Sequence, residues 1–133
     1  IPVIANGDID SPAKTRAVLD ATVQYTQERK QFGRVIGSFQ ALKHRMADMF
    51  ALVEMARSAS YAATDSLAAA DAAVAKVYCS EAFSHVAAES LQMHGGIAIT
   101  WEHDAQLYFK RAHGSSQLFG SPATYVRRFA QSA

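Results

Sequence analysis

The chain has 133 residues, of which 50% are hydrophobic and 19% are charged. This length suffices for one domain with a hydrophobic core, and this composition excludes an intrinsically disordered chain. The 13 basic and 12 acidic residues nearly balance, so the net charge does not indicate a nucleic-acid partner. The single cysteine, Cys79, favours a reducing, cytoplasmic compartment, and no apolar run has the length of a membrane span.

The proline pattern predicts long helices, because no proline occurs between Pro12 and Pro122. Ser11 is a candidate N-cap, with Pro12 at the first position of a helix that extends to about Lys30. The pair Phe32–Gly33 is expected to end this helix.

A second helix is predicted after Ser38, which has the side chain of an N-cap, and it extends through about Leu67. Its apolar residues recur with a helical period at Phe39, Leu42, Met46, Met49, Phe50, Val53 and Met55. A third helix is predicted from Asp71, as its cap, to Met93, and Gly95–Gly96 is a typical helix stop.

The remaining segments are shorter. An apolar loop is expected at Ile97–Trp101, then a helix near Glu102–Arg111, a break at His113–Ser116 and a last helix after Ser121–Pro122. Together these elements predict an all-α fold: one antiparallel four-helix bundle over residues 1–133. The β-branched run at Ile1–Ile9 allows a short N-terminal strand or an extended arm.

Two motifs resemble one known family. The stretch from Tyr25 to Met49, which contains E-R-K-Q-F-G and S-F-Q-A-L-K, is similar to the C-terminal helical domain of acyl-CoA dehydrogenases. Q-M-H-G-G, within Glu89–Asp104, follows at the spacing of that domain, and the resemblance extends from about Arg16 to Ala133. Enzymes of this family use FAD to oxidise the Cα–Cβ bond of an acyl-CoA thioester.

The resemblance implies a set of FAD contacts across a subunit interface. The Arg29 guanidinium suits a pyrophosphate, and glycine permits close approach of the backbone to a cofactor. Considered alone, Arg29 is more typical of a solvated charge at a helix end, and Gly95–Gly96 of a helix stop. The implied cofactor-binding residues are Arg29, Gln31, Phe32, Phe39, Gln40, Gln92, Met93, His94, Gly95 and Gly96.

The family's usual base is a glutamate in a turn before the last helix. That turn corresponds here to Phe119–Ser121, which places Gly120 at the position of the glutamate. Glu102 and Asp104 are more typical of helix-start charges than of displaced bases, so no catalytic residue is assigned. The stretch Leu118–Ala123 resembles family members that are non-catalytic partners in heteromeric enzymes of steroid or fatty-acid catabolism.

A different resemblance concerns residues 1–20, which are similar to a strand-turn-helix unit of the TIM barrel of tRNA-dihydrouridine synthases. This hypothesis divides the domain into a foreign segment, residues 1–20, and a dehydrogenase-like bundle, residues 21–133. The chain is then a natural or engineered chimera, and the alternative function is that of a structural domain without catalytic activity.

The remaining candidates favour association over chemistry. The helix predicted over Phe39–Tyr61 has apolar residues on more than one face, so a homo- or hetero-oligomer is expected. The family implies an acyl-CoA substrate for the parent enzyme, whereas neither a nucleic acid nor a membrane is expected as a partner. No metal site is expected, because no metal-binding spacing occurs among His44, His85, His94, His103 and His113.

Overall fold

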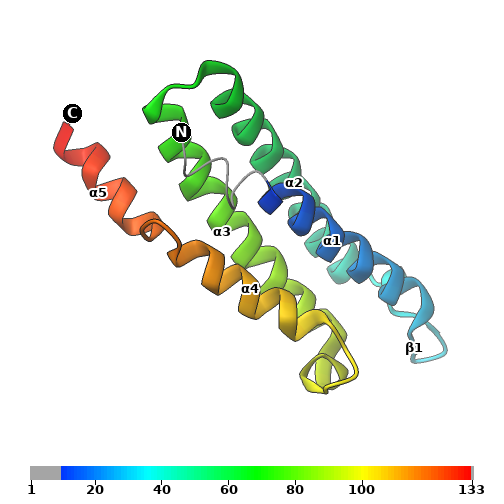
Figure 1. Cartoon of the computed structure of the whole chain (residues 1–133). Coiled ribbons are helices and arrows are strands. Elements are labelled where there is room, and N and C mark those ends of the chain that lie inside the picture. The colour runs from blue at the N-terminus through cyan, green and yellow to red at the C-terminus, as the bar shows by residue number, and fades with distance from the viewer. Residues whose placement is uncertain (1–9, 133) are drawn as a thin grey trace.

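The computed structural model describes residues 10–132 and folds them as an antiparallel helical bundle (Figure 1). Helix α3 runs through its middle and packs against each of the other helices. Helices α4 and α5 follow one another along α3 and together take the fourth position, which confirms the predicted all-α four-helix arrangement. The helices are α1 (Asp10–Glu28), α2 (Gln40–Ser66), α3 (Ala69–His94), α4 (Ala105–Gln117) and α5 (Pro122–Ser132).

The main hydrophobic core lies between α1, α2, α3 and the middle of α4. Its side chains come from positions spaced three or four residues apart, so each helix contributes one apolar stripe. Phe83 of α3 is 1% exposed, and Met49 of α2 is completely buried. The cluster consists of Val18, Leu19, Met49, Val53, Phe83, Val86, Ala87, Met93 and Ala112.

A small hairpin between α1 and α2 was not predicted. Strands β1 (Lys30–Gln31) and β2 (Arg34–Val35) pair antiparallel, and the 3₁₀ helix η2 (Ile36–Ser38) leads into α2. Phe32–Gly33 therefore forms the two-residue turn of the hairpin, directly after the last residue of β1, and does not end α1, which stops at Glu28. Both have positive φ, 53° and 76°, as a two-residue type I′ turn requires.

Both predicted caps after α1 are wrong. The Ser38 hydroxyl donates to the Val35 carbonyl at 2.7 Å, and α2 begins at Gln40 without a side-chain cap. Asp71 lies within the first turn of α3, whose N-cap is Ala68. From there its carboxylate can interact favourably with the dipole of α3, although it caps no backbone N–H.

Helix α4 is longer than predicted, since it passes through the expected break at His113–Ser116. Ala112 and Ser116 are both buried, and Lys76 of α3 donates through Nζ to the Ser115 carbonyl at 3.0 Å. These contacts with α3 outweigh the low helix propensity of glycine and serine. The expected loop at Ile97–Trp101 begins inside a 3₁₀ helix, η3 (Gly95–Ile99).

The other helix ends agree with the sequence more closely. Helix α3 stops at Gly95, and α5 begins at Pro122, as predicted. Helix α1 already begins at Asp10, so Pro12 is its third residue, and the strand expected at 1–9 lies outside the described residues. Among the helices of residues 10–132, none combines the length and apolarity that a membrane span requires.

Candidate functional site

The first group of predicted cofactor residues lies where α1 passes into the hairpin. The backbone of Arg29 is held at both ends: its N–H donates to the Tyr25 carbonyl at 2.9 Å, and its carbonyl accepts from the Ile36 N–H at 2.8 Å. Its side chain is exposed, and no carboxylate in residues 10–132 forms an ion pair with it. The structure thus holds the backbone of Arg29 in place and leaves its guanidinium exposed, where it can bind an anion.

The turn of the hairpin presents an aromatic ring to solvent. Phe32 is 91% exposed, and its ring meets that of Phe39 edge-on at a centroid distance of 6.3 Å. The guanidinium carbon of Arg34 lies 3.9 Å from the centre of the Phe39 ring. Arg34 and Phe39 therefore form a cation–π pair next to the exposed ring of Phe32. Gln31 and Gln40, which flank these aromatics, are exposed as well.

The second group lies at the end of α3, where successive residues point in different directions. Gln92 is exposed, whereas Met93 is 6% exposed within the core and His94 is 5% exposed. Gly95 has φ +64° and ψ −145°, a conformation that side-chain-bearing residues rarely adopt. A Cβ atom at Gly95 or Gly96 would have no neighbour within 4 Å, so the backbone there faces open space.

The burial of these residues decides which of their atoms a ligand can reach. The side chain of Gln92 and the backbone of Gly95 and Gly96 are accessible to a ligand. The side chains of Met93 and His94 point into the bundle, where Met93 belongs to the core and the His94 ring borders a cavity. At the surface beside Gly95, their predicted contacts with a cofactor are therefore expected from backbone atoms.

Tyr25 and His94 join the two groups. The hydroxyl of Tyr25, in the last part of α1, donates to the backbone carbonyl of His94 at 3.3 Å, and the two rings lie 4.3 Å apart. The hairpin and the end of α3 consequently lie at the same end of the bundle (Figure 1). Tyr25 belongs to the first motif, but no sequence pattern indicated its partner, since 69 positions separate the two residues.

Buried polar groups surround the His94 ring. Nδ1 lies 2.7 Å from the Ser90 carbonyl oxygen, which can only accept, so this nitrogen carries a proton. A further hydrogen bond of 2.8 Å joins the hydroxyls of Thr22 and Ser90. Burial lowers the pKa of His94, the hydrogen bond to Ser90 raises it in part, and the charge of nearby His103 lowers it again. Burial of the ring thus favours its neutral form.

A cavity of about 260 Å³ borders this ring between α1, α3 and α4. Glu102 and Asp104 lie on its wall, and the His103 ring is 4.4 Å from that of His94. Within residues 10–132, no three His, Cys, Asp or Glu side chains are arranged to hold a metal ion.

The hairpin and the first turns of α2 form a basic segment. Residues 29–47 contain five lysines and arginines and no acidic residue. In the described part of the chain, only Arg45 of these five forms an ion pair, with Glu89 of α3. The other four are Arg29, Lys30, Arg34 and Lys43, all exposed. Exposed cations without an ion pair, at this density, attract a phosphate-bearing ligand.

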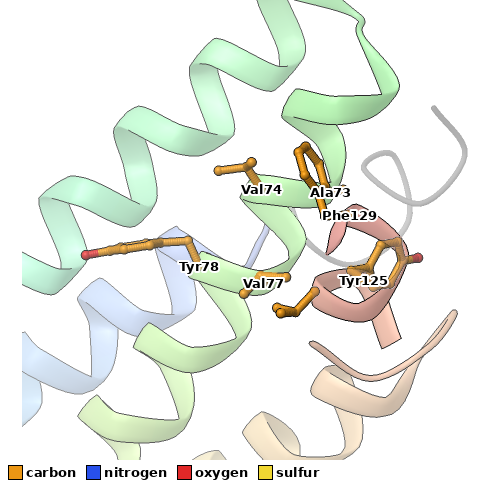
Figure 2. Close-up of a pocket in the computed structure, with 7 residues that line it drawn as sticks. Ala73, Val74, Val77, Tyr78, Tyr125 and Phe129 are labelled. Carbon is orange, nitrogen blue, oxygen red and sulfur yellow. The ribbon is translucent and has the colours of Figure 1, made fainter. Parts of the chain in front are cut away.

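A second, apolar pocket lies at the other half of α3, between it and α5 (Figure 2). Its volume is about 220 Å³, and no carboxylate, imidazole or amine lines it. It therefore offers hydrophobic contact without groups for catalysis at neutral pH. The lining residues are Ala73, Val74, Val77, Tyr78, Tyr125, Val126 and Phe129.

Comparison with known proteins agrees with this architecture. The family model for the acyl-CoA dehydrogenase C-terminal domain matches residues 9–133. The chain belongs to this family. Because the match includes residues 9–20, it gives no support to the TIM-barrel fragment that was expected there.

Three similar proteins illustrate the relationship. Acyl-CoA dehydrogenase IpdE2 of Mycolicibacterium smegmatis is 57% identical over 110 residues, which are 83% of this chain and 35% of that protein. A variant of the Tcur3481-Tcur3483 steroid ACAD is 28% identical, with a TM-score of 0.84, over 91% of this chain and 35% of that one. The FAD complex of PigA is 26% identical, with a TM-score of 0.81, over 89% of this chain and 32% of that one. The chain thus spans only about a third of these relatives.

Gly120, the position that the resemblance assigned to the family's base, lies in the turn between α4 and α5. Gly120 has φ +109°, and a Cβ atom there would lie 3.4 Å from the Tyr125 ring. The Tyr125 hydroxyl donates to the Phe119 carbonyl at 2.8 Å and closes this turn. The turn is therefore shaped for glycine, and Gly120 offers no group that accepts a proton.

Proposed function

We propose that this chain is the C-terminal domain of a FAD-dependent acyl-CoA dehydrogenase-like protein, to which it contributes FAD contacts and an oligomer interface. The observation that carries this proposal is the contact between Tyr25 and His94. It brings the exposed Arg29 and the open backbone at Gly95–Gly96 to one end of the bundle. We treat residues 1–133 as one domain, in a cytoplasmic protein.

The residues at this end fit the adenine half of FAD. The Arg29 guanidinium supplies charge-assisted hydrogen bonds to a pyrophosphate, and Phe32 supplies an exposed ring for contact with a flat base. Gly95 and Gly96 allow the backbone to approach closely. The remaining contacts are assigned to Gln31, Phe39, Gln40, Gln92 and the backbone of Met93 and His94. FAD, when bound, accepts the hydride that leaves the acyl-CoA.

Arg29 and Gly120 have opposite implications for activity. The surface around Arg29 suits a cofactor, while Gly120 replaces the carboxylate that removes the α-proton of the substrate. The chain is therefore inactive alone and acts beside a catalytic partner subunit. The similarity to a steroid ACAD favours a steroid or fatty acyl-CoA as the substrate of the parent enzyme.

Exposed apolar side chains support the oligomer interface. Trp101 is 95% exposed, and Phe32 is 91% exposed, although both rings favour burial. At the other half of the bundle, Val126 and Phe129 of α5 are about half exposed beside the apolar pocket (Figure 2). Aromatic residues of this exposure are typical of protein interfaces.

The alternative is a structural domain that folds and associates but binds no flavin. The missing proton acceptor at Gly120 favours this alternative as much as it favours a heteromeric enzyme. The two functions differ in one property, which is the binding of FAD by the surface around Arg29.

The visible absorption spectrum of the chain after incubation with FAD and desalting distinguishes them. We expect the wild type to retain flavin bands, and Arg29→Gln to lose them without loss of helical circular dichroism. Arg127→Gln is the matched control, because it removes an exposed arginine from α5. A colourless wild-type protein with full helicity would support the structural alternative and contradict our proposal.

A further inference from the structure

The polar contacts behind the candidate site form a connected network. Thr22 and Tyr25 of α1 contact Ser90 and His94 of α3 through side-chain and backbone hydrogen bonds of 2.8 Å and 3.3 Å. Thr22 and Ser90 are at most 2% exposed. Because the groups are shielded from water, their mutual geometry is more restricted than that of surface contacts.

Each end of this network continues directly into a candidate ligand-contacting segment. Tyr25 accepts, through its carbonyl, the N–H of Arg29. His94 is the last residue of α3, and the next residue, Gly95, donates its N–H to the carbonyls of Gln92 and Leu91. Tyr25 thus makes two contacts: its hydroxyl is bonded to His94, the residue before Gly95, and its backbone carbonyl is bonded to the N–H of Arg29.

We propose that Tyr25 is a positioning residue, which fixes the Gly95–Gly96 turn relative to Arg29 through its hydroxyl bond to the His94 carbonyl. This inference rests on the proposed FAD site, for which it names the residue that sets the geometry. Tyr25 itself does not touch the cofactor. It acts through His94, whose Nδ1 is hydrogen-bonded to the Ser90 carbonyl and whose ring lies 4.3 Å from the Tyr25 ring.

The chain contains a matched control for a test of this role. Tyr125 also donates its hydroxyl to a backbone carbonyl, that of Phe119, next to a glycine with positive φ. Tyr125 lies in the first turn of α5, and the turn between α4 and α5 is distant from the hairpin (Figure 1). Tyr25→Phe and Tyr125→Phe therefore remove the same atom from two bonds of the same kind, a part-buried bond of 3.3 Å and an exposed bond of 2.8 Å.

Amide hydrogen exchange provides a readout that does not depend on FAD. The N–H of Gly95 is bonded to Gln92 and Leu91, and the N–H of Gly120 is bonded to the Gln117 carbonyl. We expect Tyr25→Phe to accelerate exchange of Gly95 about fivefold and to leave Gly120 unchanged, and Tyr125→Phe to do the reverse. Unchanged exchange of Gly95 in Tyr25→Phe would overturn the inference.

FAD titration of the full chain gives the second readout. We expect Tyr25→Phe to weaken FAD binding about fivefold, while Tyr125→Phe binds as the wild type does. Faster exchange of Gly95 with unchanged FAD affinity would overturn the positioning role. If the wild type binds no FAD, the proposed function fails, whereas exchange of Gly95 still decides whether Tyr25 fixes the turn.

Discussion

Arg45 of α2 and Glu89 of α3 form an ion pair, with Nε 2.5 Å from Oε2. The hydrogen bond to Glu89 raises the pKa of Arg45, although partial burial opposes it, so the guanidinium stays charged at every accessible pH. This pair joins the start of α2 to α3 one turn before Gln92. It therefore braces the same end of the bundle that carries the candidate site.

Glu89→Gln is expected to lower the free energy of unfolding by about 1 kcal/mol, the upper end for partly exposed ion pairs. Asp20→Asn, which breaks the more exposed pair with Arg16 on one helix, is the control and should cost about 0.3 kcal/mol. Urea unfolding at low and high salt measures both. Equal costs for the two variants would show that the contact between α2 and α3 contributes nothing beyond a surface charge pair.

Lys76→Met is expected to destabilise the bundle by about 1–3 kcal/mol. Lys76 is 1% exposed, and its ammonium donates to the Ser115 carbonyl near the end of α4, which methionine cannot do. Lys43→Met, on the exposed face of α2, should change stability by less than about 0.5 kcal/mol. Thermal unfolding compares them, and a stable Lys76→Met variant would mean that packing alone holds α4 against α3.

Two glycine substitutions should have opposite effects. Gly120→Ala places a Cβ at φ +109° and should cost about 1–2 kcal/mol. Gly114→Ala, inside α4 with open space at the Cβ position, should stabilise by about 0.5–1 kcal/mol. Chemical denaturation measures the change in the free energy of unfolding for both variants. A neutral Gly120→Ala variant would show that the turn between α4 and α5 adapts, and that glycine is not required there.

The buried ring of His94 predicts a dependence of stability on pH. Since burial depresses the pKa of His94 below its ordinary value of 6.5, the unfolded chain binds the proton more readily. The free energy of unfolding should therefore be highest above pH 6.5 and fall as the pH is lowered toward 5. His94→Gln should flatten this slope, because glutamine does not titrate. An identical slope in wild type and variant would assign the effect to other groups.

The sequence alone was sufficient for those features that repeat locally. The spacing of Met46, Met49 and Val53 indicates one buried face of α2, and Gly95 indicates the end of α3, because helix period and helix termination depend on neighbours in the chain. The residues of the candidate site were predicted from two motifs, and the structure brings these motifs to one end of the bundle. Their roles as FAD contacts stay predictions, as does the absence of a base at Gly120.

Only the tertiary structure decided which of these side chains are accessible and which helices continue. Gln92, Met93 and His94 are consecutive, yet the packing of α1 and α4 buries the latter two and leaves the first exposed. Ser115 and Ser116 stay helical because α3 supplies Lys76 and a buried surface for α4. Such contacts join residues that are far apart in the sequence, so no local pattern contains them. Burial and long-range hydrogen bonds, unlike helix period, exist only after the chain has folded.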